Sequence, residues 1–185
     1  MKAIIFDCFG VLTTDYWRVF VATLPLAQQT AASDLNKAYD AGYISTTDFM
    51  DQVEALTGNR PDLVEHTRAP ATKNDELLRY ISQLKPQYKI GLLSNIASNW
   101  VTDKFLTANE QALFDEMIFS HNVHLVKPDH AIFELMAERL GVAPTDCVMI
   151  DVLEVNCTAA KETGMQDIVY QNFAQCRPAL EQLLS

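Results

Sequence analysis

The sequence predicts an α/β protein in which a doubly wound parallel sheet forms the core and a small helical unit is inserted. Short apolar runs recur along the chain, and segments with helical spacing separate them. This alternation is typical of a parallel sheet that helices cover on both faces. Residues 14–72 show helical spacing without a strand pattern, and they follow the first apolar run directly. The sequence therefore predicts an insertion after the first strand.

The first predicted strand is the apolar run Ile4–Phe6, which ends at Asp7. A run of this kind is typical of a strand that is buried on both faces. Open α/β sheets place their active sites at the carboxyl ends of such strands. Gly10 allows the backbone to turn sharply away after the acid. Asp7 is therefore the first candidate for a catalytic residue.

The inserted unit is expected to be helical throughout. One apolar face spans Trp17–Leu24, and a second begins at Leu35. Ser45 resembles an N-cap for a third helix, which Gly58 ends. Pro61 opens one more short helix. The apolar stripes of these helices are expected to pack into a core of their own.

Beyond the insertion, four strands and five helices are expected to alternate. The expected strands are Tyr88–Leu93, Met117–Phe119, Cys147–Ile150 and Asp167–Tyr170. The expected helices are Leu77–Leu84, one capped by Ser98, one between Asp129 and Gly141, one that ends near Thr163, and Arg177–Leu184. These expected elements divide the chain into a Rossmann-like core of residues 1–13 and 73–185 and a helical cap of residues 14–72.

Composition narrows the class of protein. Apolar residues make up 49% of the chain and charged residues 21%, and the formal net charge is −10. A chain without a basic block is not expected to bind nucleic acid or an anionic membrane surface. The four cysteines are scattered without a CxxC pair, which favours reduced thiols and a cytoplasmic location. No stretch is long and apolar enough for a signal peptide or a membrane span.

Polar residues stand at the ends of the predicted strands, and they suggest phosphoryl chemistry. They are Asp7, Ser94 with Asn95, Lys127 and Asp151. Because the carboxyl ends of parallel strands share one edge, we expect these side chains to converge. A carboxylate is a suitable nucleophile toward phosphorus, while a hydroxyl and an ammonium offset phosphoryl charge. A second carboxylate is suited to a hard divalent metal.

Four motifs in the same order resemble those of the haloacid dehalogenase-like (HAD) hydrolase superfamily, in the subclass with a helical cap after the first motif. They are Ile5-Phe6-Asp7-Cys8-Phe9-Gly10-Val11-Leu12, Leu92-Leu93-Ser94-Asn95, Val126-Lys127-Pro128-Asp129 and Val148-Met149-Ile150-Asp151. Together they span nearly the whole chain.

The resemblance implies hydrolysis of a small phosphorylated metabolite through an aspartyl-phosphate. It assigns the nucleophile to Asp7 and binding of the transferring phosphoryl group to Ser94 and Asn95. Lys127 is implied to fix the nucleophile and to offset the phosphoryl charge. The implied partner is therefore a small-molecule substrate.

The resemblance also implies a Mg²⁺ cofactor, held by Asp7, the backbone oxygen of Phe9, and Asp151. Two positions depart from the family pattern. Phe9 stands where family phosphatases usually carry an acid that protonates the leaving group. The absence of this acid is expected to lower the reaction rate by roughly 10²–10⁴-fold. Val152 stands where relatives usually carry a second acidic metal ligand. Weakened catalysis and weakened magnesium binding are therefore expected.

Two other functions stay open. A metal-independent 2-haloacid dehalogenase tolerates Phe9, because a halide leaves without a proton, and Arg18 is the candidate for its substrate carboxylate. A non-catalytic binding or regulatory protein with the same fold is the third possibility. His121 and His124 have a spacing that zinc sites use, but without a cysteine nearby a solvated or hydrogen-bonded pair is expected.

Overall fold

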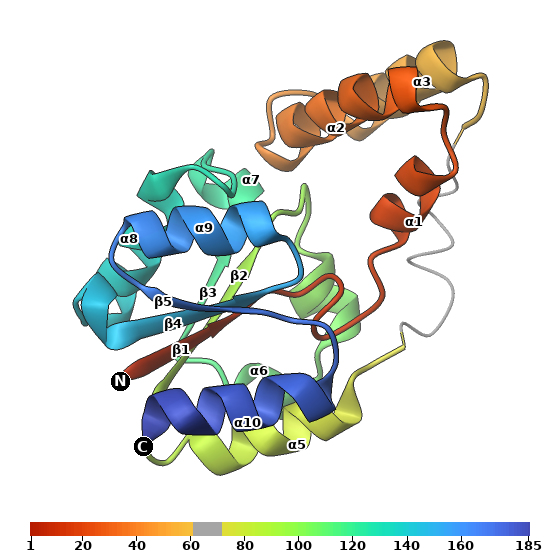
Figure 1. Cartoon of the computed structure of the whole chain (residues 1–185). Helices are drawn as coiled ribbons and strands as arrows, with labels where there is room; N and C mark the ends of the chain where they lie inside the picture. The colour runs from red at the N-terminus through yellow and green to blue at the C-terminus, as the bar shows by residue number, and fades with distance from the viewer. Residues whose placement is uncertain (61–71) are drawn as a thin grey trace.

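Five parallel strands form one sheet in the order β3-β2-β1-β4-β5, in a computed structural model that describes residues 1–60 and 72–185 (Figure 1). The strands are β1 (Ala3–Phe6), β2 (Lys89–Ser94), β3 (Glu116–Phe119), β4 (Cys147–Asp151) and β5 (Gln166–Val169). The order places β1 in the centre, where it pairs with β2 on one side and β4 on the other. The predicted parallel α/β sheet is confirmed.

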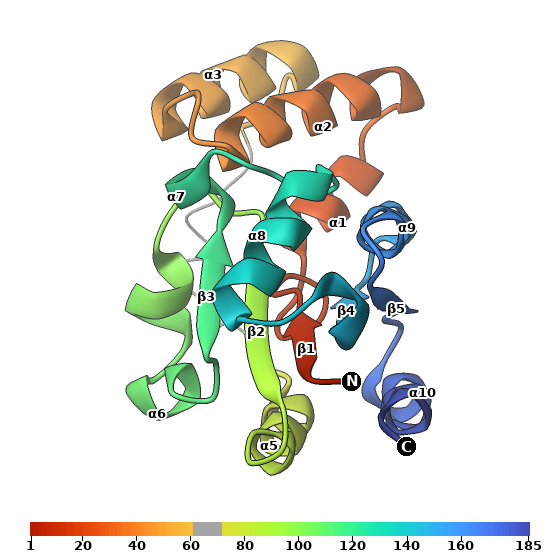
Figure 2. The same ribbon diagram turned by 90° about the vertical axis from the view of Figure 1, so that its left-hand side faces the viewer.

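Helices cover both faces of this sheet, as Figures 1 and 2 show. The helices of one face are α5 (Asp75–Leu84) and α10 (Phe173–Leu184), and those of the other are α8 (His130–Leu140) and α9 (Glu154–Glu162). Successive residues of β1 alternate between the two cores, because side chains along a strand point to opposite faces. Ile4 and Phe6 join the first core, and Ala3 and Ile5 join the second. All four residues of β1 are buried, as expected for a central parallel strand.

The inserted segment forms α1 (Tyr16–Ala22), α2 (Leu26–Asp40) and α3 (Thr46–Thr57). These helices lie beyond the carboxyl ends of the strands (Figure 2). An aromatic cluster joins them, in which the ring of Phe49 lies 5.2 Å from Trp17 and 4.4 Å from Tyr39. The expected start and end of α3 are also present: Ser45 caps its N-terminus, and Gly58 ends it at a φ of 72°. The short helix expected from Pro61 lies outside the described residues.

Short elements complete the chain, and two expected helix starts are wrong. The short elements are η1 (Val101–Phe105), α6 (Ala108–Gln111), α7 (Ser120–Val123) and η2 (Pro144–Asp146). The helix expected to be capped by Ser98 is η1, which begins at Val101 without a side-chain cap. The last helix begins at Phe173, not near Arg177. Pro178 therefore lies inside the helix rather than in its first turn. The side chain of Asn172, which accepts a hydrogen bond from the backbone N–H of Gln175, caps the earlier start.

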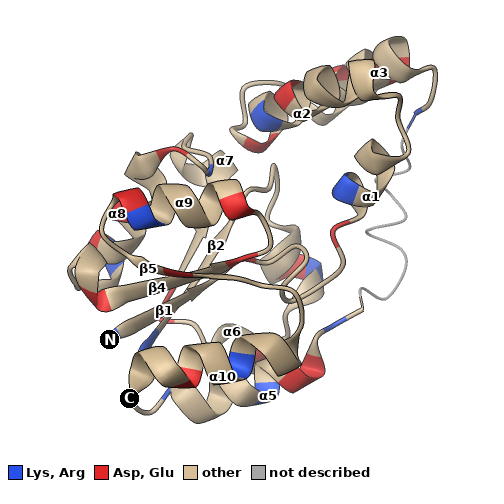
Figure 3. Cartoon of the chain, viewed as in Figure 1, with Lys and Arg blue, Asp and Glu red and all other residues tan. Residues whose placement is uncertain are grey.

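The cysteines are unpaired, and charged residues of both signs are mixed along the helices. All four cysteines are buried free thiols. Lys and Arg are interspersed with Asp and Glu along the helices in the view of Figure 3. Within residues 1–60 and 72–185, no helix has the length and apolar character required to cross a membrane.

Candidate active site

The ammonium of Lys127 is held between two carboxylates at the carboxyl edge of the sheet. Its Nζ lies 2.8 Å from Oδ1 of Asp7 and 2.6 Å from Oδ2 of Asp151. Asp7 follows β1 and Asp151 ends β4, and these two strands are neighbours in the sheet. All three side chains are buried. The predicted convergence of these residues is therefore present in the structure.

Asp151 is fixed by three donors. Its Oδ1 accepts a hydrogen bond from the backbone N–H of Leu153 at 2.8 Å, and its Oδ2 accepts one from Nδ2 of Asn156 at 3.0 Å. The third donor is the Lys127 ammonium. Because Asp151 is 0% exposed, its charge depends on these groups rather than on water. Its observed contacts position Lys127 and the start of α9.

Asp7 is held through one of its two oxygens. Within the described residues, the backbone N–H of Cys8 and the Lys127 ammonium both bind Oδ1. Oδ2 is therefore the oxygen available to a ligand. Burial and the neighbouring Asp151 charge raise the pKa of Asp7 from 3.8 to about 7, although Lys127 opposes this shift. Burial lowers the pKa of Lys127, but the two carboxylates outweigh it and raise that pKa above its ordinary value.

Ser94, at the end of β2, carries a buried hydroxyl without a partner. Ser94 is 0% exposed, and its Oγ has no hydrogen bond within the described part of the chain. A buried polar atom without a partner is uncommon in native proteins and requires an explanation. A bound phosphoryl oxygen is one suitable partner.

Asn95 makes a different contact from the one expected of a phosphate-binding side chain. Its Nδ2 donates to the backbone oxygen of Lys127 at 2.9 Å, and its Oδ1 accepts from the backbone N–H of Lys127 at 2.8 Å. The Asn95 amide is therefore committed to holding the loop that carries the ammonium. Sequence spacing contained no signal for this pairing.

The Asn95→Ala variant tests this positioning role. Loss of two hydrogen bonds in a partly buried site is expected to lower the free energy of unfolding by about 1–3 kcal/mol. Chemical denaturation measures this change. The Asn109→Ala variant, on the exposed surface of α6, is the matched control and should change stability little. Equal stability of the two variants would contradict the proposed role of Asn95.

The donor set around Asp7 does not fit a magnesium ion. Val152 offers no oxygen, and its side chain lies against the loop after β1, because a Cβ on Gly10 would be 2.8 Å from Cγ1 of Val152. Asp151 is buried with three donors already bound. Of the ligands that the resemblance implies, one oxygen of Asp7 and the Phe9 carbonyl remain, so water would have to supply the other four of the six oxygen ligands of Mg²⁺. No cluster of three or more His, Cys, Asp or Glu suited to a metal occurs in the described ranges.

The other candidates from the sequence have structural partners. His121 contacts the backbone oxygen of Ile96 through Nδ1 at 2.9 Å, and His124 contacts that of Ala41 at 2.8 Å. Of the two expected alternatives, solvated or hydrogen-bonded histidines, the structure shows the second. Arg18 lies on α1 and is exposed. The ring of Phe9 stacks on Trp100 with the centroids 5.9 Å apart, so Phe9 supplies an apolar wall at the position where an acid is usual.

Two acids of the inserted helices were missed by the sequence analysis. Asp15 caps α1, and Asp40 is the last residue of α2. Asp40 is 8% exposed, and burial raises its pKa from 3.8 to about 7. The sequence contained one signal for Asp40, because an acid at a helix C-terminus interacts unfavourably with the helix dipole. Such a local conflict is expected at functional positions.

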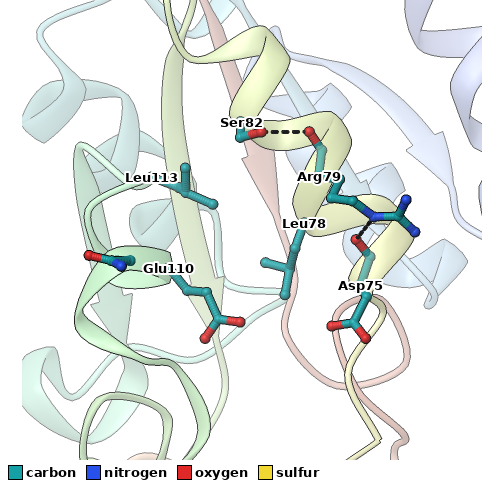
Figure 4. A pocket seen from close by; sticks show the side chains of 7 residues that line it. Asp75, Leu78, Arg79, Ser82, Glu110 and Leu113 are labelled. Carbon is teal, nitrogen blue, oxygen red and sulfur yellow. Dashed lines mark hydrogen bonds between the residues drawn. The ribbon is translucent and has the colours of Figure 1, made fainter.

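A groove of about 590 Å³ lies between α5 and α6, and it contains none of these residues (Figure 4). Two of its charged side chains are already engaged. Glu110 pairs with Lys73, and Nε of Arg79 donates to the backbone oxygen of Asp75 at 3.1 Å. The groove contains none of the residues that converge at the carboxyl ends of the strands, so the cluster around Lys127 is the stronger candidate.

Comparison with known proteins identifies a family model and two relatives that match this chain. A family model described as haloacid dehalogenase-like hydrolase matches residues 1–162. D-ribitol-5-phosphate phosphatase from Bacteroides thetaiotaomicron is 25% identical over 204 residues, covering 100% of this chain and 99% of that protein. N-acylneuraminate-9-phosphatase from Mus musculus is 27% identical over 99 residues, which are 53% of this chain and 40% of the relative.

Solved structures share the fold. A HAD family enzyme from Bacteroides thetaiotaomicron, in complex with magnesium and inorganic phosphate, superposes with a TM-score of 0.70 at 19% identity, covering 95% of this chain and 98% of that one. A 2-haloacid dehalogenase from Pseudomonas syringae pv. Tomato has a TM-score of 0.61 at 14% identity, covering 92% of this chain and 86% of that one. At these identities the structural likeness concerns the fold alone.

Proposed function

The chain belongs to the haloacid dehalogenase-like hydrolase family, and we propose that it is a phosphatase that hydrolyses small phosphate monoesters through an aspartyl-phosphate on Asp7. The observation that carries this proposal is the buried ammonium of Lys127 between Asp7 and Asp151, which leaves Oδ2 of Asp7 available. The full-length relative named D-ribitol-5-phosphate phosphatase supports a phosphorylated substrate of small size.

In the proposed reaction, Oδ2 of Asp7 attacks the phosphorus of the substrate. The bond between phosphorus and the leaving oxygen breaks, and water then releases phosphate from Asp7. The ammonium of Lys127 orients the nucleophile through Oδ1 at 2.8 Å. It also offsets the charge of the phosphoryl oxygens in a site from which water is largely excluded.

The Ser94 hydroxyl and the backbone N–H of Asn95 are proposed to bind the phosphoryl oxygens. The support for Ser94 is its buried and unpartnered Oγ. The side chain of Asn95 is instead proposed to hold the backbone of Lys127 in place. The predicted phosphoryl-binding pair is thus retained as a proposal, with a divided role for Asn95.

We further propose that residues 1–13 and 73–185 are the catalytic core and residues 14–72 the cap that covers the substrate. The position of α1, α2 and α3 beyond the carboxyl ends of the strands supports this division (Figure 2). The four buried free thiols support a cytoplasmic location.

The proposed function is tested with the purified protein and two substrates. Hydrolysis of p-nitrophenyl phosphate is expected, whereas halide release from a 2-haloacid is not. Rapid quenching during turnover should trap a phosphorylated protein, which intact mass measurement detects. Halide release without phosphate hydrolysis would support the dehalogenase, and absence of both activities would support the non-catalytic alternative.

A further inference from the structure

Asp40 is attached to the same edge of the sheet as Asp7. Its backbone oxygen accepts a hydrogen bond from Oγ of Ser120 at 2.6 Å. Ser120 follows β3 directly, and its Oγ accepts a second hydrogen bond from the backbone N–H of Ile96 at 2.8 Å. Ile96 lies just beyond the end of β2. These bonds fix the C-terminal end of α2 against two neighbouring strand ends.

The same end of α2 is also attached through the residue after Asp40. Nδ1 of His124 contacts the backbone oxygen of Ala41 at 2.8 Å, and the ring of His124 stacks with that of Tyr43. Two segments of the core, the end of α7 and the end of β3, therefore hold Asp40 in position.

The Asp40 carboxyl group is buried, and the charges of the site act on it. Nδ2 of Asn36 donates to its Oδ2 at 2.7 Å, and within the described residues this bond leaves Oδ1 without a donor. The charges that act on Asp40 come from Asp15 at the start of α1, Lys127 and Asp7. Burial is the largest cause that raises the pKa of Asp40 to about 7. An acid with such a pKa carries a proton in part of the population at neutral pH, as a general acid requires.

We propose that Asp40 of the cap supplies the leaving-group proton that Phe9 cannot supply. The inference rests on the proposed phosphatase function. When Oδ2 of Asp7 bonds to phosphorus, the leaving oxygen departs with the bonding electron pair and takes the proton of the Asp40 carboxyl group. In the second step the Asp40 carboxylate accepts a proton from the water that attacks the phosphorus, and the bond to Asp7 breaks to release phosphate.

The Asp40→Asn variant tests this role with two phosphate esters that differ in their leaving groups. An alkyl phosphate requires a proton on its leaving oxygen, whereas p-nitrophenyl phosphate releases a stable phenolate. The ratio kcat/KM for the alkyl ester is expected to fall by about 10²–10⁴-fold, and kcat/KM for the aryl ester is expected to stay within about threefold. The aryl ester should also give a stoichiometric burst of phenolate, because the second step lacks its base.

Asp34→Asn is the matched control, since Asp34 lies on the same helix with a side chain that is 69% exposed. The control should leave both substrates unaffected. An equal loss on both esters in Asp40→Asn, or no loss on either, overturns the assignment. A wild-type protein inactive on both esters would instead refute the proposed phosphatase itself.

A pH profile of the wild-type protein gives a second test, which does not depend on the folding of a variant. Because the alkyl ester requires both ionised Asp7 and protonated Asp40, its kcat/KM should pass through a maximum near pH 7 and decline at higher pH. The aryl ester should lack this decline. A decline that is the same for both esters contradicts the role of Asp40 in leaving-group protonation.

Discussion

Replacing Asp7 by asparagine is expected to lower the phosphatase kcat/KM by roughly 10⁴-fold or more, because the nucleophile is removed while the binding groups remain. The trapped phosphorylated protein should disappear at the same time. The fold should be retained, since an asparagine oxygen can accept the hydrogen bond that the backbone N–H of Cys8 now donates to Asp7. Lys127 would keep its ion pair with Asp151.

Thermal unfolding of Asp7→Asn is the accompanying measurement. Because burial raises the pKa of Asp7 to about 7, the ionised native carboxylate is destabilised relative to the unfolded chain. The contribution of Asp7 to stability is present below pH 3.8 and is lost as the pH rises through about 7. The variant should therefore be at least as stable as the wild-type protein at pH 8. Asp34→Asn again serves as control, and retained turnover in Asp7→Asn would exclude Asp7 as nucleophile.

The fold could be predicted because its signals are local. The buried strand β1 appears as an uninterrupted apolar run, and Gly58 and Gly141 mark the ends of α3 and α8 with left-handed backbone conformations. The start of α10 was placed too late, because it depends on a single cap, the hydrogen bond that the side chain of Asn172 accepts from the backbone N–H of Gln175. Helix boundaries depend on such individual side-chain bonds, which an apolar pattern does not contain.

The convergence of Asp7, Lys127 and Asp151 was predictable for a topological reason. Parallel strands end at one edge, so residues at different strand ends meet without any further information. The contacts of Asn95 and Asp40 depend on loop geometry and on how α2 meets α7, and neither follows from spacing. The sequence therefore identified the residues on the sheet, while the structure was required for those that the loops and the inserted helices contribute.

Replacing Val152 by aspartate is expected to tighten Mg²⁺ binding by roughly a hundredfold, equivalent to about 2.7 kcal/mol. The substitution would place a carboxylate against the loop after β1 that contains Gly10. This group adds the oxygen donor that Asp151 cannot supply while it binds Lys127, Asn156 and the backbone N–H of Leu153. Isothermal titration with magnesium measures the affinity without reference to turnover.

Val155→Asp is the matched control for the Val152→Asp variant, because Val155 is 57% exposed on α9 and the substitution makes the same change of charge. If Val152→Asp alone binds magnesium tightly and hydrolyses p-nitrophenyl phosphate faster in its presence, the position of the added carboxylate is the cause. Tight binding by the wild-type protein, unchanged in the variant, would mean that Asp151 gives up its present partners to reach the metal. The wild-type affinity thus distinguishes a site that relies on Lys127 for charge compensation from one that rearranges around magnesium.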